Sequence, residues 1–203
     1  GHAGKRAPVS LRVNPDVDPK THPYIATGLK ESKFGVAFDD ALELYRRASD
    51  LPFVDVCGID CHIGSQITDL SACVEAAEKM FGLVDQLEAD GIALRHVDLG
   101  GGLGVRYRDE ETIDPRAYAL AVRRALGSRR HELLFEPGRF LVGAAGVLLT
   151  RVIYLKPGGS RDFAIVDAAM NDLLRPALYD AWHAVEPVRP REEPARRWQI
   201  VGP

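Results

Sequence analysis

The sequence predicts an α/β protein: parallel strands alternate with helices over residues 1–145, and an antiparallel β domain begins over residues 146–203. Strand-like apolar segments alternate with segments of helical periodicity in the first part. Polar or glycine-rich residues follow each of these strands. Near residue 146 the pattern changes to two strands joined by a short turn. The alternation is typical of a barrel or of a doubly wound sheet, and the pattern alone leaves both open.

The first elements are a strand, a loop, a helix and a second strand. Residues 8–14 alternate as a strand, and residues 15–35 form a polar, proline-rich loop whose length favours a functional role. Residues 38–49 have helical spacing, with aspartates at 39–40 where carboxylates complement exposed N–H groups. Residues 53–65 are apolar enough to predict a strand that is buried on both faces.

The next elements repeat the same order. Apolar residues recur at helical spacing over 70–87, and Gly91 stands where a glycine is expected to end the helix. Residues 93–102 predict a strand. Residues 114–126, which begin with Asp-Pro, predict a capped helix. Residues 131–140 supply a further strand. Together these segments predict a parallel sheet with helices outside it.

Composition excludes several classes of protein. The chain has 203 residues, a formal net charge of -3 and 46% hydrophobic residues, which is typical of a globular protein. No long run of like charge indicates a nucleic-acid partner. No segment approaches the roughly 20 apolar residues of a membrane span, and residues 1–10 lack the apolar core of a signal peptide. We therefore expect a cytoplasmic protein without nucleic-acid or membrane partners.

The three cysteines predict reduced thiols. Cys57, Cys61 and Cys73 are spaced neither as a disulfide framework nor as a paired zinc knuckle. His62 is adjacent, but neighbouring residues of one strand point to alternating faces. We therefore predict no metal site.

Polar residues gather just past the ends of four strands. They are Asn14, residues 62–65, residues 100–102 and residues 136–139. The carboxyl ends of parallel strands meet at one edge of the sheet, and ligands bind at that edge. The glycine triplet indicates a close approach of backbone to a ligand, because N–H groups reach an anion where no Cβ intervenes. A phosphate is the predicted ligand.

Each of these motifs also has a purely structural interpretation. The glycines can form a turn, and His62 can be a hydrogen-bonded, partly buried histidine. Glu136 can accept hydrogen bonds at the end of its strand, with Arg139 as its surface ion partner. An imidazole, a backbone cradle, a carboxylate and a guanidinium at consecutive strand ends instead favour one shared cavity.

The motifs occur in an order that resembles the diaminopimelate decarboxylase family of lysine biosynthesis. They are RVNPDVD (12–18), THPYIATGLKESKFG (21–35), GIDCHIGSQ (58–66), DLGGGLGVRY (98–107), EPGRFLV (136–142) and VDAAMNDLLRPALYDAWH (166–183). Ornithine and arginine decarboxylases share the glycine loop and the Glu-Pro-Gly-Arg segment. The segment MNDLLRPALY favours the diaminopimelate branch.

The resemblance implies a pyridoxal-phosphate enzyme of the alanine racemase-like fold. Such an enzyme has a (β/α)8 TIM-type barrel followed by a β domain, and it works as a homodimer with its sites at the interface. This chain then corresponds to the later, incomplete part of the barrel (1–145) and the truncated start of the β domain (146–203). The implied activity is decarboxylation of the amino acid meso-diaminopimelate to L-lysine.

The resemblance also implies a role for each motif residue. Gly100, Gly101, Gly102 and Ser65 hold the cofactor phosphate, and the residues of the fourth strand end that contact the cofactor are Glu136, Pro137, Gly138 and Arg139. The His62 ring stacks on the pyridine, and Glu136 keeps the pyridine nitrogen protonated. Arg139 binds the phosphate or a substrate carboxylate. Arg175 and Tyr179, four residues apart, bind the far end of the substrate.

The chain departs from the family pattern in two places. The cofactor lysine lies in an early segment resembling YAxKAN, and the catalytic cysteine in a segment resembling CES; neither segment occurs here. We therefore expect this chain alone to be inactive. Two other functions stay open: decarboxylation of arginine or ornithine, and a non-catalytic phosphate-binding module on the same scaffold.

Overall fold

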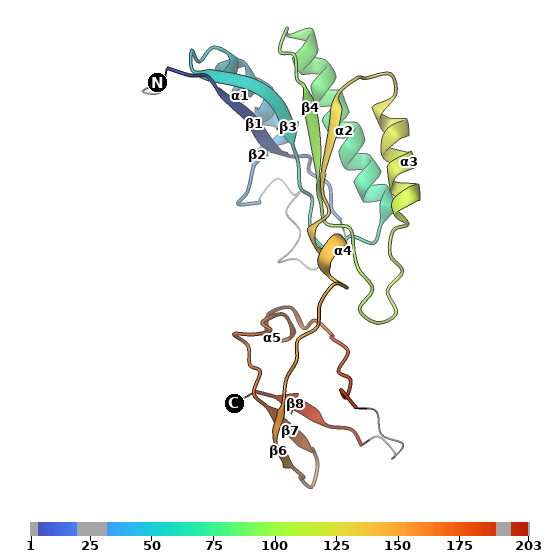
Figure 1. The fold of residues 1–203 in the computed structure, drawn as a ribbon. Helices are drawn as coiled ribbons and strands as arrows, with labels where there is room; N and C mark the ends of the chain where they lie inside the picture. The colour runs from blue at the N-terminus through green and yellow to red at the C-terminus, as the bar shows by residue number, and fades with distance from the viewer. Residues whose placement is uncertain (1–3, 20–31, 190–195, 203) are drawn as a thin grey trace. The chain divides into compact units, whose positions relative to one another are not determined.

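The protein folds into two compact units, which we describe separately (Figure 1). The structure, a computed structural model, describes residues 4–19, 32–189 and 196–202. The first unit comprises Gly1–Arg106 and Glu110–Ala144, and the second Tyr107–Asp109 and Ala145–Pro203. Most of the predicted 15–35 loop, with its THPYIATGLKE sequence, lies outside the described residues. Within the described ranges, no helix is both long and apolar enough to cross a membrane.

The first unit is built on a parallel sheet, as the sequence predicts. Its five strands follow the order β2-β1-β3-β4-β5, and every neighbouring pair is parallel. The strands are β1 (Ala7–Asn14), β2 (Val36–Ala37), β3 (Val54–Asp60), β4 (His96–Gly101) and β5 (Glu132–Glu136). The helices are α1 (Phe38–Ser49), α2 (Leu70–Ala89), α3 (Pro115–Leu126) and α4 (Gly138–Val142). Two short elements, β2 and α4, were not predicted.

The helix boundaries follow from local chemistry. The Asp114 carboxylate accepts hydrogen bonds from the backbone N–H groups of Arg116 (3.1 Å) and Ala117 (3.2 Å), which caps α3 in front of Pro115. After the carboxyl end of α2, Gly91 has a φ of 82°, the left-handed conformation that commonly follows a helix. The capping prediction for α3 and the helix-ending glycine of α2 are both confirmed.

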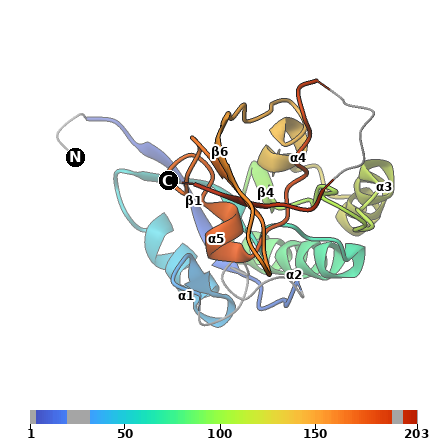
Figure 2. The same cartoon turned by 90° about the horizontal axis from the view of Figure 1, so that it is seen from below.

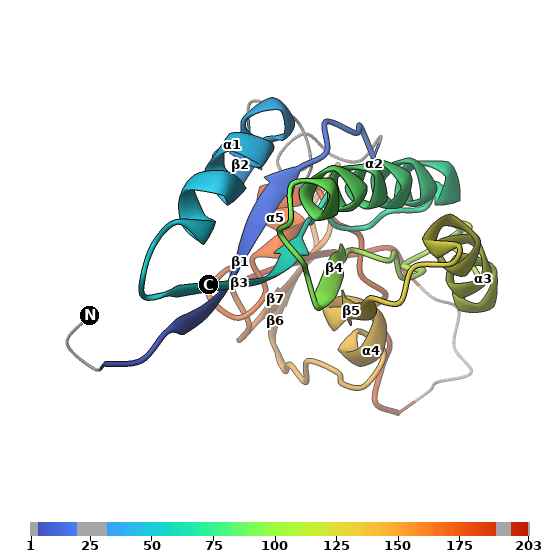
Figure 3. The same ribbon diagram turned by 90° about the horizontal axis from the view of Figure 1, so that it is seen from above.

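The helices α1, α2 and α3 lie on the same face of the sheet in both end-on views (Figures 2 and 3). The buried side chains of Ile59 and Val97 belong to the hydrophobic core that this face shares with α1 and α2. The opposite face carries a polar row, in which Arg12, Asp60 and Asp98 are register partners on β1, β3 and β4. The expectation that residues 53–65 are buried on both faces therefore holds only in the middle of β3, where the consecutive residues Cys57, Gly58 and Ile59 are all buried. Only one face of β3 packs on helices, and the charged row occupies the other.

The second unit contains a mixed three-stranded sheet. Strand β6 (Val152–Lys156) pairs antiparallel with β7 (Phe163–Val166), and β8 (Gln199–Val201) pairs parallel with β7. The parallel pair departs from the antiparallel sheet that the sequence predicts. It is possible because more than 30 residues, including α5 (Arg175–Tyr179), separate β7 from β8, and parallel pairing requires such a crossover.

Candidate active site

The polar motifs of the first unit converge on the carboxyl edge of its sheet. His62 lies two residues past β3, Gly101 ends β4, and Glu136 ends β5. Gly101 and Glu136 are register partners, and β3 pairs with β4 immediately before His62. The structure therefore brings the His62, glycine and Glu136 motifs together, as expected for the ends of neighbouring parallel strands.

The imidazole of His62 is fixed by the glycine loop. Its Nδ1 accepts a hydrogen bond from the backbone N–H of Gly101 at 3.2 Å, and the Arg12 Nη2 donates to the His62 carbonyl at 3.3 Å. Burial, and next the positive charge of Arg12, lower the pKa of His62. Protonation at Nδ1 would also remove the acceptor that Gly101 uses. The site thus holds a neutral imidazole at a defined position.

The glycine triplet allows neighbouring strand ends to pack closely. A Cβ on Gly101 would lie 1.9 Å from the Glu136 carbonyl oxygen, and one on Gly102 would lie 2.0 Å from the Gly64 carbonyl oxygen. Gly102 also has a φ of 94°, which L-residues rarely adopt. The close approach that the sequence predicts is therefore made, in this structure, to protein backbone.

Two amide groups of the triplet already have protein partners. The Gly100 N–H donates to Asp98 Oδ1 at 2.8 Å, and the Gly101 N–H donates to His62 Nδ1. The idea that these amides face an anion directly does not describe this geometry. They position the loop and the imidazole instead.

Sequence reasoning missed Gln66, which connects the turn after His62 to the glycine loop. Ser65 and Gln66 form this turn, and the Ile67 N–H donates to the Gly102 carbonyl at 2.8 Å. The Gln66 side chain binds the backbone of Val105. Gln66 stands inside the GIDCHIGSQ motif, but an amide side chain is so common on protein surfaces that its position alone gave no signal.

The segment after β5 begins α4. Glu136 is exposed at the end of the strand, and Pro137 caps the helix that starts at Gly138. Arg139 is partly buried, and its Nη1 donates to Gln66 Oε1 at 3.3 Å. Among the described residues, Arg139 forms no ion pair with Glu136 or with another carboxylate, so the surface-pair interpretation is wrong. A Cβ on Gly138 would meet no atom within 4 Å apart from its chain neighbours, so the start of α4 is open at this position.

Two carboxylates, Asp60 and Asp98, lie on the polar face of the sheet just before its carboxyl edge. They were not predicted from the sequence as site residues. Burial raises the pKa of Asp60, whose Oδ1 accepts a hydrogen bond from Ser10 Oγ at 3.3 Å. The negative charges of Asp98 and Glu136 raise the pKa of Asp60 further, while Arg12 lowers it. The edge thus presents both carboxylates and guanidinium groups to a ligand.

An apolar groove of about 250 Å³ borders the glycine loop on its other side. Its lining includes Leu103, Tyr118, Phe135, Phe140 and Leu141. Leu133, two residues before Phe135, packs into the helix-side core, so Phe135 faces the same side. The groove therefore lies away from the charged row and offers no cation to a phosphate.

The predicted substrate residues lie on α5 of the second unit. The Arg175 guanidinium carbon is 5.4 Å from the centre of the Tyr179 ring and 5.6 Å from that of Tyr107. The Arg175 Nε is buried and has no hydrogen-bond partner. Stacking on two aromatic faces orients the guanidinium. Tyr107, which sequence reasoning missed, lies 68 residues before Arg175, so no local pattern links the two.

Comparison with known families identifies the fold. Residues 2–143 match the family described as "Pyridoxal-dependent decarboxylase, pyridoxal binding domain". The chain belongs to this family. Its first unit is therefore part of the pyridoxal-binding domain of a decarboxylase, with the parallel sheet of the TIM-barrel domain, and pyridoxal phosphate is its cofactor.

Several relatives of this chain are diaminopimelate decarboxylases. The chain is 60% identical to those of Pseudomonas aeruginosa and Neisseria meningitidis over 98% of its own length, but it covers only 48% and 49% of theirs. The crystal structure of diaminopimelate decarboxylase from Helicobacter pylori complexed with L-lysine is 44% identical, with a TM-score of 0.94; the match covers all of this chain and 50% of that one. The chain thus spans about half the length of these relatives.

A lysine decarboxylase has the same fold at lower identity. The structure from Selenomonas ruminantium is 27% identical, with a TM-score of 0.79, over the whole of this chain and 51% of that one. Decarboxylases with different substrates therefore share this scaffold.

The residues at the carboxyl edge fit pyridoxal phosphate. The cofactor presents a phosphate and a flat aromatic ring. Arg139 supplies a cation that no described carboxylate neutralises, and the preceding residue, Gly138, has open space at its Cβ position. His62 supplies a neutral ring held in place. A cation, a fixed ring and an open approach are the features that such a ligand requires.

Proposed function

We propose that the whole protein to which this chain belongs decarboxylates meso-diaminopimelate to L-lysine with pyridoxal phosphate. The convergence of His62, the glycine loop, Glu136 and Arg139 on one edge of a parallel sheet carries the proposal. The identity to diaminopimelate decarboxylases supports this substrate over arginine or ornithine.

The architecture is part of the same proposal. Residues 1–145 supply later βα units of a (β/α)8 barrel, and residues 146–203 begin a β domain that follows it. Helices on one face of the first sheet, with a charged row on the other, support a barrel arc with its interior on the charged side. We propose that the protein works in the cytoplasm as a homodimer.

The cofactor-binding residues have distinct tasks in this proposal. Arg139, Ser65 and the loops of Gly100, Gly101, Gly102, Pro137 and Gly138 surround the phosphate. The neutral His62 ring stacks on the cofactor ring; the Gly101 N–H fixes the orientation of the imidazole, and Arg12 holds the His62 backbone through its carbonyl. The Glu136 carboxylate favours a proton on the ring nitrogen. When bound, pyridoxal phosphate supplies the electron sink that decarboxylation requires.

The residues proposed to bind the substrate are Arg139, Arg175 and Tyr179. Arg175 offers a guanidinium oriented by the faces of Tyr107 and Tyr179, and this fork matches a carboxylate in charge and shape. A second carboxylate distinguishes diaminopimelate from lysine, arginine and ornithine. Arg139 would contribute at the phosphate or at a substrate carboxylate.

The test of the substrate is carbon dioxide release by the whole protein with pyridoxal phosphate. We expect meso-diaminopimelate to be turned over, and lysine, arginine and ornithine to be poor substrates. Arg175→Ala should lower kcat/KM for diaminopimelate by a factor that corresponds to about 2–4 kcal/mol while sparing cofactor affinity. Preferential turnover of arginine or ornithine would support the first alternative. Cofactor binding without turnover of any of them would support a non-catalytic module.

A second substitution tests the role of Glu136. In the whole protein, Glu136→Gln should keep cofactor binding and lose most of the decarboxylation rate, because a neutral amide no longer favours a charged ring. Steady-state decarboxylation measures this. A rate within about threefold of wild type, less than about 1 kcal/mol of barrier, would contradict the role.

A further inference from the structure

The side chain of Gln66 joins the segments that follow three neighbouring strands. Its Nε2 donates to the Val105 carbonyl at 2.6 Å, and its Oε1 accepts from the Val105 N–H at 3.2 Å. The same Oε1 accepts from Arg139 Nη1 at 3.3 Å. Gln66 itself follows β3, Val105 follows β4 and Arg139 follows β5. One amide group therefore connects the turn after His62, the glycine loop and the cation of the site.

The backbone at Gln66 gives no reason for a long polar side chain. Its φ is 58°, in the left-handed region where glycine is favoured and other residues are strained. Neighbouring backbone bonds already fix the turn, since Ile67 N–H donates to the Gly102 carbonyl and Gly104 N–H donates to the Ile67 carbonyl. Glycine would therefore satisfy this backbone at lower conformational cost. A strained residue of this kind points to a task for its side chain.

Arg139 is the group that gains from this contact. A free arginine side chain samples many rotamers, and ordering them on ligand binding weakens affinity. The guanidinium has five N–H donors, and among the described residues only one hydrogen bond, to Gln66, is made by them. A neutral amide orients the group without neutralising its charge. The charge stays available for an anion.

We propose that Gln66 is a positioning residue that holds Arg139 and the glycine loop in the conformation that binds the cofactor phosphate. This rests on the proposed cofactor site. Gln66 itself touches neither the phosphate nor the reacting atoms. It orders the cation before the ligand arrives and fixes Val105 relative to it.

Gln66→Gly is the decisive variant, because glycine removes the side chain and also relieves the left-handed backbone. Affinity is measured in the whole protein with pyridoxal phosphate and, separately, with inorganic phosphate. We expect each affinity to fall about tenfold while the urea midpoint changes little, because relief of the left-handed backbone offsets the lost hydrogen bonds to Val105. Gln66→Glu should lose more affinity, because its carboxylate neutralises Arg139. Thr68→Ala, at an exposed residue two positions on, is the matched control and should bind as wild type.

A double-mutant cycle separates positioning from a general structural effect. Arg139→Ala should weaken phosphate binding, and adding Gln66→Gly to it should cause little further loss, since both act through the same guanidinium. At saturating cofactor, kcat of Gln66→Gly should stay within about twofold of wild type. Wild-type affinity in Gln66→Gly, or independent losses in the cycle, would overturn the positioning role while leaving the proposed cofactor site intact. A wild-type protein that binds neither probe would overturn both.

Discussion

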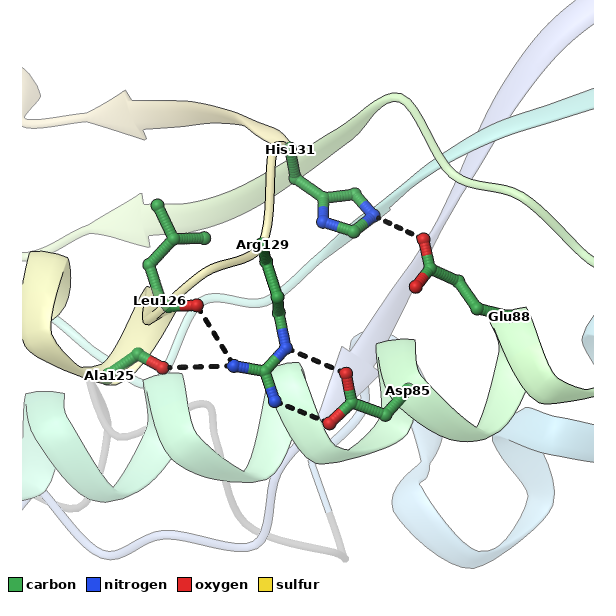
Figure 4. A network of polar contacts seen from close by, with 6 residues as sticks. All are labelled: Asp85, Glu88, Ala125, Leu126, Arg129 and His131. Carbon is green, nitrogen blue, oxygen red and sulfur yellow. Dashed lines mark hydrogen bonds and ion pairs between the residues drawn. The ribbon is translucent and has the colours of Figure 1, made fainter.

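At the amino ends of the parallel strands, charged side chains pair with opposite charges, whereas at the carboxyl ends they bind backbone amides and a neutral amide side chain. Arg129 forms an ion pair with Asp85 of α2, and next to this pair the His131 Nε2 lies 3.1 Å from Glu88 Oε1 (Figure 4). The pairs Arg46–Asp90 (2.7 Å) and Arg95–Asp55 (3.0 Å) lie at the same end. At the other end, Asp98, His62, Gln66 and Arg139 bind glycine amides, the Val105 backbone and one another.

The difference separates stability from ligand binding within one sheet. Arg129 contributes to structure only: its Nε donates to Asp85 Oδ1 at 2.7 Å, and its Nη1 donates to the carbonyls of Ala125 (3.2 Å) and Leu126 (3.0 Å) at the end of α3. The Arg129 hydrogen bonds lower the pKa of Asp85. The positive charge of Arg129 is already paired with a carboxylate, so it is not available to bind an anionic ligand. Arg139 has no such partner among the described residues, which leaves its charge for an anion.

The largest effect should come from Gly101→Ala at the carboxyl edge. The new Cβ would lie 1.9 Å from the Glu136 carbonyl oxygen, so the ends of β4 and β5 must separate. We expect about 3 kcal/mol of destabilisation or loss of the folded state, measured by urea unfolding. Gly82→Ala in α2 is the control. Its Cβ would meet no atom within 4 Å, and it should gain about 0.5–1 kcal/mol. Equal stability of the two variants would contradict the packing account.

Arg129→Ala should lower the free energy of unfolding through contacts at the amino ends of the strands, without changing ligand binding at their carboxyl ends. Loss of the Asp85 pair and of the α3 carbonyl contacts should cost about 1–2 kcal/mol, a modest value because Asp85 is half exposed. Affinity for pyridoxal phosphate should stay within about twofold of wild type. Asp85→Asn, which keeps one acceptor, should be less destabilising. A cofactor affinity that falls with stability would show that the two ends are coupled.

His62 should give the carboxyl end its own pH dependence. Its folded-state pKa is lowered from the ordinary value of 6.5, so between that value and the folded-state pKa the unfolded chain binds more protons. Stability therefore rises with pH in this window and is lost as pH falls through it. His62→Asn, which cannot titrate there, should flatten this part of the curve of unfolding free energy against pH. Urea unfolding across the window measures this. An unchanged slope would contradict the partly buried, neutral His62 ring.

The smallest effect on stability should come from Gly138→Ala, which tests ligand binding at the carboxyl end separately from folding. Its Cβ meets no protein atom within 4 Å, and alanine favours the first turn of α4, so the unfolding free energy should change by less than about 0.5 kcal/mol. Cofactor affinity should nevertheless fall about fivefold if the open space at Gly138 holds the phosphate. Fluorescence titration with pyridoxal phosphate measures this. Unchanged affinity would place the phosphate elsewhere along the edge.

Much of the site could be predicted because strand ends are local features. Apolar segments gave β1, β3, β4 and β5, and parallel topology then required that the residues after them share one edge. The short elements β2 and α4 were missed because a two-residue strand and a five-residue helix carry no periodicity. Gln66 and Tyr107 were missed because their partners lie far along the chain.

The amino-acid sequence was enough to predict the order of the longer strands and helices of the first unit, the Asp114 cap, and the gathering of His62, the glycines and Glu136 at one edge. These features depend on contacts between near neighbours or on topology. The hydrogen-bond partner of each group could be learned only from the three-dimensional structure. The amides of Gly100 and Gly101 donate to Asp98 and His62, and Arg139 donates to Gln66 and makes no pair with Glu136. Hydrogen bonds are made at about 3 Å in a given direction, so partners depend on how strand ends meet in space.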